Sequence, residues 1–497
     1  MRQFVLGNCL ASVAVLLAIA ALSAADAIPA TARMNVLLLD FEDFSAASLA
    51  CYGNTICRSP NLDRLAETGV LFERAYVQAV CCNPSRSSFL SGLRPETTNV
   101  HTNSDPMPER LPPGTKTLPT YFKERGFYLA NIGKLFHGGF EGEHLRCFDR
   151  LEFAPKPDGW QGPGPIANFP PARKRAGIAP AVKKGDPGYE KWRRAQSDRY
   201  GDSGLAEEEE GDYRFSVTAV ALLKEFAKDN RHFFLSVGSH RPHTPLIAPK
   251  KFLDLYDPAS ISAPMAPPDK DQNIPEVARK FGRSSDIFMT KPATPEQARA
   301  AVAAYYACVT MVDTCIGRIL DTLEQEGLAD NTIVVFLGDH GFHLGEHGLW
   351  SKYTLFEQSR RSPLIVRVPG MAGNGRKCRQ LVEFVDILPT LGQLCGLDVP
   401  ATLEGTSFVP LLQDPARPWK KAAFTEFTSN KTVNHAVVNE RYRYAEWPYQ
   451  GELFTELYDL EKDPWETVNV SSDPAYAETR AEMAALLKSG WKSALPQ

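Results

Sequence analysis

Four short apolar runs, rich in β-branched residues, stand far apart along the chain and have the length of buried strands. They occupy residues 35–39, 233–237, 333–337 and 363–368. Runs that do not alternate with polar residues are typical of strands covered on both faces, as in a parallel sheet. Helical patterns separate them at residues 60–68, 118–125, 213–228, 294–327 and 382–395. We therefore predict an α/β fold with a large, mixed, mostly parallel sheet flanked by helices.

The pattern of apolar positions changes after residue 413. Short alternating runs follow at residues 422–427, 436–439 and 442–447, then a Leu-Tyr-Asp-Leu motif from Leu457 and a helical pattern near 475–488. A chain of 497 residues can hold one large domain and a small appendage. We predict a catalytic domain over residues 34–412 and a small antiparallel α+β subdomain over residues 413–497.

The first residues have the layout of a cleaved export signal. Arg2 precedes an apolar run over residues 9–22, and small residues follow it up to Ala27. A membrane anchor is the alternative, but the run is shorter than the ~20 residues that span a bilayer. We predict a signal peptide over residues 1–27, a periplasmic or secreted protein, and no membrane contact beyond export.

Composition narrows the possible partners and bonds. Hydrophobic residues make up 43% and charged residues 23%, which excludes disordered and fibrous classes. The net charge of -4 gives no reason to expect nucleic acid as a partner. The ten cysteines are not densely spaced, so a disulfide scaffold is not indicated. The sequence leaves open whether Cys51 pairs with Cys57.

Residues 138–212 are rich in Pro and Gly, and we predict a long excursion over the surface. Glu207 to Glu210 end its charged stretch. Two interpretations stay open: a pocket wall that attracts an anionic polymer, or a solvated charged loop. The basic cluster on which the first interpretation rests comprises Arg173, Lys174, Arg175, Lys183, Lys184, Lys191, Arg193 and Arg194.

The stretch CNPSR at positions 82–86 combines a nucleophile with the start of a helix. Pro84 has a backbone angle suited to the first helical turn, and Gly92 is a natural stop. Cys82 therefore lies beside unpaired N–H groups that favour negative charge, and Arg86 points its donors to the same place. This arrangement indicates hydrolysis of an oxyanion ester. A buried cysteine before an ordinary helix is the alternative.

Two acidic pairs follow predicted strands. Glu42 and Asp43 come after the first strand, and Asp339 and His340 come after the strand at 333–337. Carboxyl ends of parallel strands share one edge of a sheet, so the pairs can converge on one metal ion. Three carboxylates favour calcium, with magnesium or manganese behind it, although an imidazole ligand suits transition metals better. Alternatively, each pair merely caps a helix.

These motifs together resemble the type I sulfatases. C-x-P-S-R followed by L-S-G is similar to the family signature, and residues 339–352, DHGFHLGEHGLWSK, are similar to its second metal motif. His340, GKLFH at 133–137 and GSHRPH at 238–243 are most similar to the iduronate-2-sulfatase branch. The match runs in order from about residue 34 to 375. It implies an alkaline-phosphatase-like fold.

The resemblance also implies a mechanism. A separate maturation enzyme would oxidise Cys82 to formylglycine, whereas Cys81 is out of frame and is expected to be a packed residue at a strand end. The hydrated aldehyde would attack the sulfur and later expel sulfate. A divalent metal would be bound by Glu42, Asp43, residue 82, Asp339 and His340.

The same resemblance assigns roles around the reacting group. Arg86 and His137 would orient the diol, and Asp339 would be the base. His243 would donate the proton to the departing alcohol, a role that His240 can exchange with it. The side chains expected around the sulfate are Lys134, His240, His243 and Lys352.

Three functions remain in competition. The first is a sulfatase acting on a sugar or a sulfated polysaccharide. The second is a phosphonate monoester or phosphodiester hydrolase of the same superfamily, against which Lys134, His137, His243 and Lys352 argue. The third is a catalytically silent polysaccharide-binding protein, which would follow if Cys82 were never matured.

Overall fold

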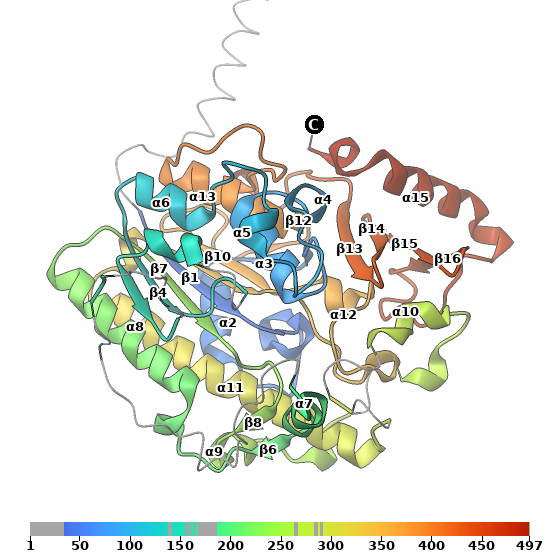
Figure 1. Ribbon diagram of the computed structural model, residues 1–497, viewed down its shortest axis with the longest axis horizontal. Helices are drawn as coiled ribbons and strands as arrows, with labels where there is room; N and C mark the ends of the chain where they lie inside the picture. The colour runs from blue at the N-terminus through green and yellow to red at the C-terminus, as the bar shows by residue number, and fades with distance from the viewer. Residues whose placement is uncertain are drawn as a thin grey trace, which may run out of the picture.

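A computed structural model describes residues 34–137, 142–154, 156, 161–163, 166, 186–262, 267–282, 287–288 and 292–496. The predicted signal peptide lies outside these residues. An eight-stranded sheet runs through the molecule (Figure 1). Its strands, in spatial order, are β11 (Lys377–Cys378), β2 (Val70–Phe72), β10 (Leu364–Arg367), β9 (Thr332–Gly338), β1 (Asn35–Phe41), β7 (Phe233–Ser239), β4 (Tyr128–Gly133) and β5 (Arg150–Glu152).

Helices cover both faces of this sheet, as predicted. Successive residues of β1 point to opposite faces, so Val36 and Leu38 join one apolar core while Leu37 and Leu39 join the other. The first core is covered by α3 (Cys82–Ser91), α6 (Leu118–Glu124), α13 (Ile387–Cys395) and α14 (Val409–Gln413). The second is covered by α2 (Pro60–Thr68), α8 (Gly211–Lys228) and α11 (Pro295–Gln325).

The strand and helix predictions hold with two corrections. The β10 strand is antiparallel to both β9 and β2, because the apolar pattern carries no information about strand direction. The helical pattern at 382–395 forms an α-helix only from Ile387, since Val382–Glu383 is strand β12 and Phe384–Asp386 is a 3-10 turn. Strand β12 pairs with β3 (Ala75–Tyr76) in a separate two-stranded sheet.

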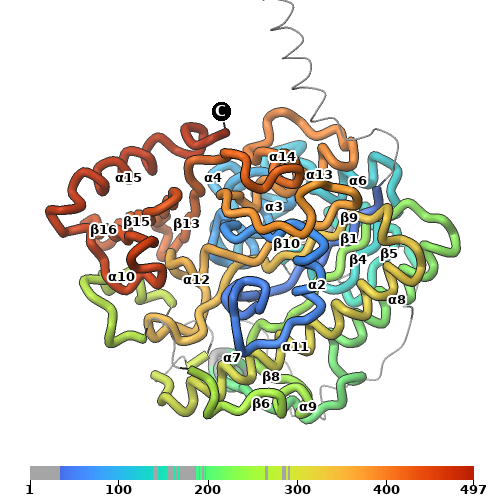
Figure 2. Tube along the Cα trace, turned by 180° about the vertical axis from the view of Figure 1, so that it is seen from behind, coloured from blue at the N-terminus to red at the C-terminus, as the bar shows by residue number. Residues whose placement is uncertain are grey.

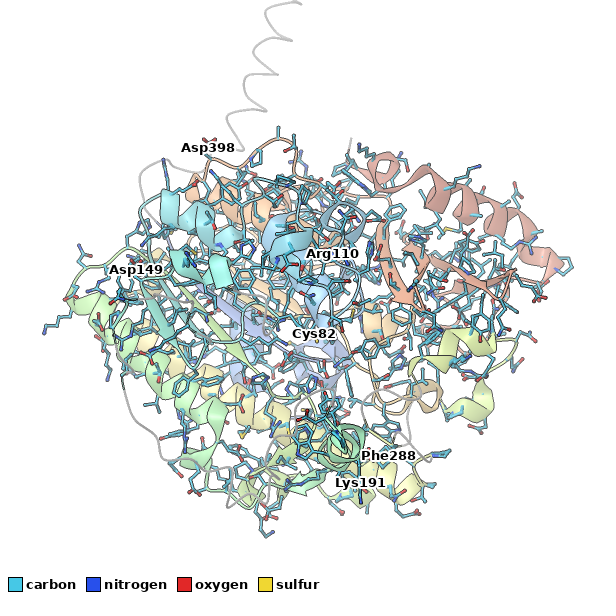
Figure 3. All side chains as sticks on the ribbon, in the orientation of Figure 1. Cys82, Arg110, Asp149, Lys191, Phe288 and Asp398 are labelled. Carbon is cyan, nitrogen blue, oxygen red and sulfur yellow. The ribbon has the colours of Figure 1, made fainter. Side chains whose placement is uncertain are left out.

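The segment 138–212 contains more secondary structure than the predicted surface excursion. It includes α7 (Tyr189–Ser197) and β6 (Tyr200–Asp202), which pairs with β8 (Leu246–Ala248). Lys191 on α7 is exposed, and Figure 3 places it toward the periphery in a view where Cys82 is central. Arg173, Lys174, Arg175, Lys183 and Lys184 lie outside the described residues, as do the side chains of Arg193 and Arg194.

The C-terminal region forms the predicted antiparallel sheet. Its strands run in sequence order: β13 (Ala423–Ser429), β14 (Thr432–Val438), β15 (Tyr442–Tyr449) and β16 (Glu452–Asp459). Helix α15 (Ala477–Ser489) covers one face, where Val437 and Leu457 meet Met483. Phe427 and Trp447 on the other face belong to a core of the large sheet. The small sheet therefore packs as an extension of the main fold, as the view from behind also shows (Figure 2).

Remaining short helices connect these layers. They are α4 (Pro95–Thr98), α5 (Met107–Arg110), α9 (Lys250–Leu253), α10 (Glu276–Lys280) and α12 (Glu357–Arg360). The nine cysteines of the described chain are free thiols, so Cys51 and Cys57 are not paired. Among the described residues, α11 alone has the length and composition of a membrane span, but 89% of its apolar window is buried inside the fold. It is the core helix of the second apolar core.

A buried ion-pair network joins the C-terminal region to strand β12 and the turn before α13. Lys420 Nζ lies 2.8 Å from Glu383 and 2.7 Å from Asp386, and Arg94 donates to both oxygens of Glu383. All four side chains are buried. Removing one partner of such a network leaves charge unpaired in a poorly solvated place, which is strongly destabilising.

We expect Lys420→Met to lower the free energy of unfolding by about 3–5 kcal/mol, measured by urea denaturation, because two buried carboxylates lose their shared cation. Lys116→Met is the matched control. Lys116 pairs with Glu124 on the surface, and its substitution should leave the unfolding midpoint unchanged. Equal midpoints for the two variants would show that the network does not hold the C-terminal region in place.

Candidate functional site

Four parallel strands end together and bring the predicted acidic pairs to one edge. Phe41 at the end of β1 is in register with Gly338 of β9 and Ser239 of β7, and Gly133 of β4 is in register with Gly238. A side chain at Gly238 would lie 1.4 Å from the carbonyl oxygen of Lys134. This close approach requires glycine and lets the chains leaving β4 and β7 lie side by side.

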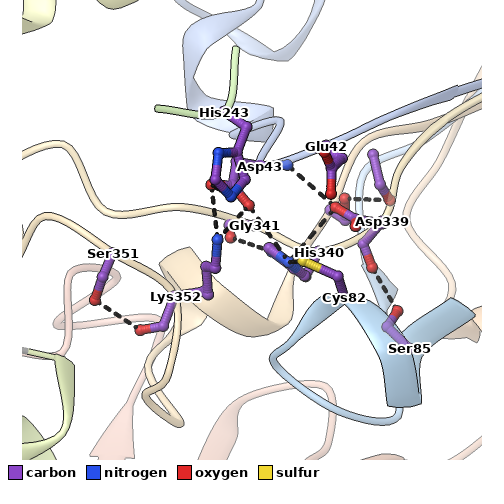
Figure 4. A network of polar contacts seen from close by, with 12 residues as sticks. Glu42, Asp43, Cys82, Ser85, His243, Asp339, His340, Gly341, Ser351 and Lys352 are labelled. Atoms are coloured by element: carbon purple, nitrogen blue, oxygen red, sulfur yellow. Dashed lines mark hydrogen bonds and ion pairs between the residues drawn. The ribbon is translucent and has the colours of Figure 1, made fainter. Parts of the chain in front are cut away.

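The two pairs that follow β1 and β9 meet as predicted (Figure 4). The backbone N–H of Asp43 donates to Asp339 Oδ1 at 3.1 Å. His340 Nε2 lies 3.5 Å from both Asp43 Oδ1 and Asp339 Oδ1. His340 Nδ1 donates to the carbonyl oxygen of Gly341 at 2.9 Å, so Nε2 is the ring nitrogen that faces the carboxylates. These side chains are fully buried.

Cys82 is the first residue of α3, where the sequence places it. Its Sγ lies 3.3 Å from His340 Nε2. Burial raises the pKa of the Cys82 thiol well above its usual range, so the sulfur is protonated at neutral pH and is a poor nucleophile. Gly92 ends the helix in a left-handed conformation, as predicted. Cys81 is the N-cap residue of α3, which corrects its expected place at a strand end.

Arg86 is held by three groups around the start of α3. Its guanidinium donates to Asp339 Oδ2 at 3.1 Å, to the carbonyl oxygen of Leu135 at 2.9 Å, and to Asp40. Burial raises the pKa of Asp40 to about 7, even against the charge of Arg86. Sequence reasoning missed Asp40, although a lone carboxylate inside the apolar run of β1 was a visible signal.

Each of the two predicted lysines pairs with one carboxylate of the acidic pair that follows β1. Lys134 pairs with Glu42, and Lys352 Nζ lies 2.9 Å from both oxygens of Asp43. Burial alone would raise the pKa of Glu42, but Lys134 and a hydrogen bond with His240 hold it well below its usual range. Glu42 is therefore ionised at neutral pH.

The three predicted histidines differ in their contacts with the acidic side chains of the site. His240 Nδ1 lies 2.7 Å from Glu42 Oε2, and its side chain is 66% exposed. His243 Nε2 lies 3.7 Å from Asp43 Oδ2. Burial and the charge of Lys134 lower the pKa of His137 to about 3, so its ring is neutral, and its Nδ1 has no partner among the described residues.

Tyr305 in α11 holds the backbone of Asp43 in a left-handed conformation. Asp43 has φ of 54°, a left-handed conformation that costs energy for a residue with a side chain. The hydroxyl of Tyr305 donates to the carbonyl oxygen of Asp43 at 2.7 Å and accepts from the N–H of Ser45 at 2.8 Å. No motif pointed to this residue, which lies about 260 positions from its partners.

The donor atoms suit a divalent metal ion. Asp43, Cys82 and His340 offer ligand atoms within 4.8 Å of one another, and so do Glu42, Cys82 and Asp339. Three buried carboxylates around one point repel one another unless cations compensate them. Such a set of oxygens with one imidazole can coordinate a hard or borderline cation.

Comparison with known proteins shows the family of the chain. A family model described as Sulfatase matches residues 34–397, and one described as N-sulphoglucosamine sulphohydrolase, C-terminal, matches residues 345–492. The chain belongs to the sulfatase family. Iduronate 2-sulfatase of Mus musculus is 34% identical over 435 residues, covering 78% of this chain and 73% of the mouse protein. A sulfatase of Formosa agariphila is 33% identical over 465 residues, covering 92% and 86%.

Solved structures share the fold. The phosphonate monoester hydrolase of Agrobacterium radiobacter has a TM-score of 0.71 at 24% identity, covering 92% of this chain and 95% of that chain. At this identity the likeness shows the fold alone. Family membership confirms the predicted type I sulfatase resemblance, the alkaline-phosphatase-like fold and the activity of a sulfuric ester hydrolase.

We expect Tyr305→Phe to lower kcat/KM for a sulfate ester by about 10–100-fold, because Asp43 loses the support of its backbone. The lost buried hydrogen bonds should also cost about 1–3 kcal/mol of stability. Steady-state sulfate release and chemical denaturation measure the two effects. Tyr306→Phe is the control, since the Tyr306 hydroxyl contacts Asn54. Unchanged turnover in Tyr305→Phe would contradict this role for Tyr305.

Proposed function

We propose that this sulfatase hydrolyses a sulfate ester of a saccharide, through a formylglycine made from Cys82 and with a bound divalent metal ion. The contact between Cys82 and His340 carries the proposal, because a buried, protonated thiol lies at the centre of the carboxylate cluster. A thiol held in that state has little use as a nucleophile. Conversion by a formylglycine-generating maturation enzyme, acting on the C-x-P-S-R stretch, would give position 82 a reactive group.

Formylglycine would supply a hydrated aldehyde: one hydroxyl oxygen would bond to sulfur as the bond from sulfur to the ester oxygen breaks. Loss of the proton of the second hydroxyl would then re-form the carbonyl and release sulfate. Asp339 is the base that accepts the proton of the attacking hydroxyl. Burial would raise the pKa of Asp339, but His340 and Arg86 hold it below its usual range, so this carboxylate is ionised and ready to accept.

Glu42, Asp43, Asp339 and His340 would hold the metal ion, with calcium the first choice because three of the four are carboxylates. The ion would supply positive charge that polarises the sulfate and the group at position 82. Lys134 and Lys352, whose ammonium groups reach these carboxylates, would also contact the sulfate and offset charge that develops on the bridging oxygen.

The surrounding groups then have separate tasks. Arg86, fixed between Asp40 and Asp339, orients position 82. His137 has a neutral ring and would accept or donate a hydrogen bond to the diol. His243, 3.7 Å from Asp43, is the proton donor to the departing alcohol, and exposed His240, which pairs with Glu42, can exchange this role with it.

A sulfated sugar or polysaccharide is the substrate class that the relatives favour, since the mouse protein is named iduronate 2-sulfatase. We assign catalysis to residues 34–412 and treat residues 413–497 as a small C-terminal subdomain. Export to the periplasm or the extracellular space, by the signal at residues 1–27, would bring the enzyme to such a polymer. A phosphonate monoester or phosphodiester hydrolase is the second candidate, because the fold is shared with one.

Cys82 should carry an aldehyde, or its hydrate, in active enzyme, and Cys81 should remain a thiol. Tryptic mass spectrometry of the peptide containing both residues distinguishes them. Cys82→Ala should abolish turnover, whereas Cys81→Ala, next to it in the same peptide, should retain it. An intact thiol at position 82 in fully active enzyme would rule out the formylglycine mechanism, and an intact thiol in inactive protein would favour a silent polysaccharide-binding role.

Chelation should abolish sulfate release, and calcium should restore it best, because carboxylates dominate the donor set. The measurement is the initial rate of sulfate release from a sulfated saccharide after dialysis against a chelator and addition of each ion. Faster turnover of a phosphodiester than of any sulfate ester, with best recovery in manganese or zinc, would contradict the sulfatase proposal. It would indicate a phosphonate monoester or phosphodiester hydrolase instead.

A further inference from the structure

A second group of metal-binding side chains lies on the C-terminal sheet. Glu426 of β13 is directly opposite His435 of β14, which is directly opposite Glu446 of β15. Residues paired in this way share one face of an antiparallel sheet, with their Cβ atoms about 4.5–5.5 Å apart. The parallel row beside them, Phe424, Val437, Tyr444 and Leu457, packs under α15. An apolar row and an acid–imidazole–acid row therefore lie next to each other on the same face.

A third carboxylate approaches this row from the large domain. Glu96, in α4, offers a ligand atom that lies within 4.8 Å of those of Glu426 and His435. The three residues line one cavity of about 490 Å³, whose wall also includes Glu446 and Trp491. None of the residues of the Cys82 site lines this cavity.

One carboxylate oxygen of Glu426 has no hydrogen-bond partner among the described residues. Glu426 is only 2% exposed, and its Oε1 lies 2.7 Å from His101 Nδ1, but its Oε2 is buried and has no hydrogen-bond partner in the described part of the chain. A buried carboxylate oxygen without a partner is costly. Arg94 also lines the cavity, but its guanidinium is committed to Glu383.

We propose that Glu96, Glu426 and His435 form a second metal site, which takes a borderline divalent transition metal, zinc first. One imidazole and two carboxylates are common zinc ligands, and water or Glu446 can complete a tetrahedron. Ligand atoms about 2.0–2.2 Å from zinc lie about 3.3–3.6 Å from one another, so the ligand atoms need to approach one another by at most about 1.5 Å. His101 then holds the outer oxygen of Glu426 and orients that ligand.

The ion would tie together two parts of the chain that flank the catalytic helix. Glu96 follows α3 directly, whereas Glu426 and His435 belong to the C-terminal sheet. The backbone N–H of Glu426 also donates to the carbonyl oxygen of Gln78, just before Cys82. Zinc at this place would act as a structural cross-link, since it stabilises the docked arrangement and not the unfolded chain.

Metal content tests the proposal on the complete, calcium-loaded enzyme. Three proteins are dialysed with zinc in excess calcium: wild type, the double variant Glu96→Gln/His435→Gln and the exposed control Glu452→Gln. Bound zinc is then measured by mass spectrometry. We expect one zinc per chain in wild type and control, and at least tenfold weaker binding in the double variant. Glu96 and His435 are not fully buried, so the double variant should fold and retain sulfatase activity.

Anomalous diffraction at the zinc edge locates the ion without any substitution. A peak between Glu96, Glu426 and His435 in wild-type crystals soaked in zinc and calcium supports the site. Equal zinc content in wild type and double variant, no bound zinc in either, or an anomalous peak only beside Asp339 would overturn it.

Discussion

Parallel pairing of β1 with both β9 and β7 is the constraint on which the rest of the site depends. The pairing stops at Phe41, Gly338 and Ser239, so the next residues of three separate segments leave the sheet at one point. Glu42 and Asp339 need no long loop to meet, and the rigid sheet fixes their separation. A shift of one residue in either pairing would turn these side chains to the wrong face.

Buried carboxylates that lie close together repel one another, and positively charged side chains from the surrounding fold offset this repulsion. Arg86 is fixed between Asp40 and Asp339, while Lys134 and Lys352 reach Glu42 and Asp43. The N-terminus of α3 adds partial positive charge beside Cys82. Nearby positive charge holds the pKa values of Glu42 and Asp339 below their usual range, while burial raises the pKa of the Cys82 thiol. A protonated thiol at position 82 is a poor nucleophile, and this supports the proposed conversion of the side chain.

Features that depend on short stretches of neighbouring residues were predictable from the sequence. Strands β1, β7 and β9, helices α2 and α11, and both acidic pairs follow from short patterns and motifs. The antiparallel direction of β10 and helix α7 were missed, because periodicity does not encode direction and nearby Pro and Gly hide a short helix. Asp40, Tyr305 and the Glu426–His435 row depend on register and long-range packing, which one sequence does not contain. The family resemblance supplied residue roles that spacing alone left open.

The most direct test of the mechanism asks whether residue 82 itself takes the sulfuryl group. In Cys82→Ser the new hydroxyl can attack sulfur but has no second hydroxyl with which to expel sulfate. Intact-mass spectrometry after mixing this variant with a sulfated saccharide should therefore show one sulfate ester per chain, located at position 82, without further turnover. Continued multiple turnover by Cys82→Ser, or a sulfate ester on a different residue, would contradict attack on sulfur from position 82.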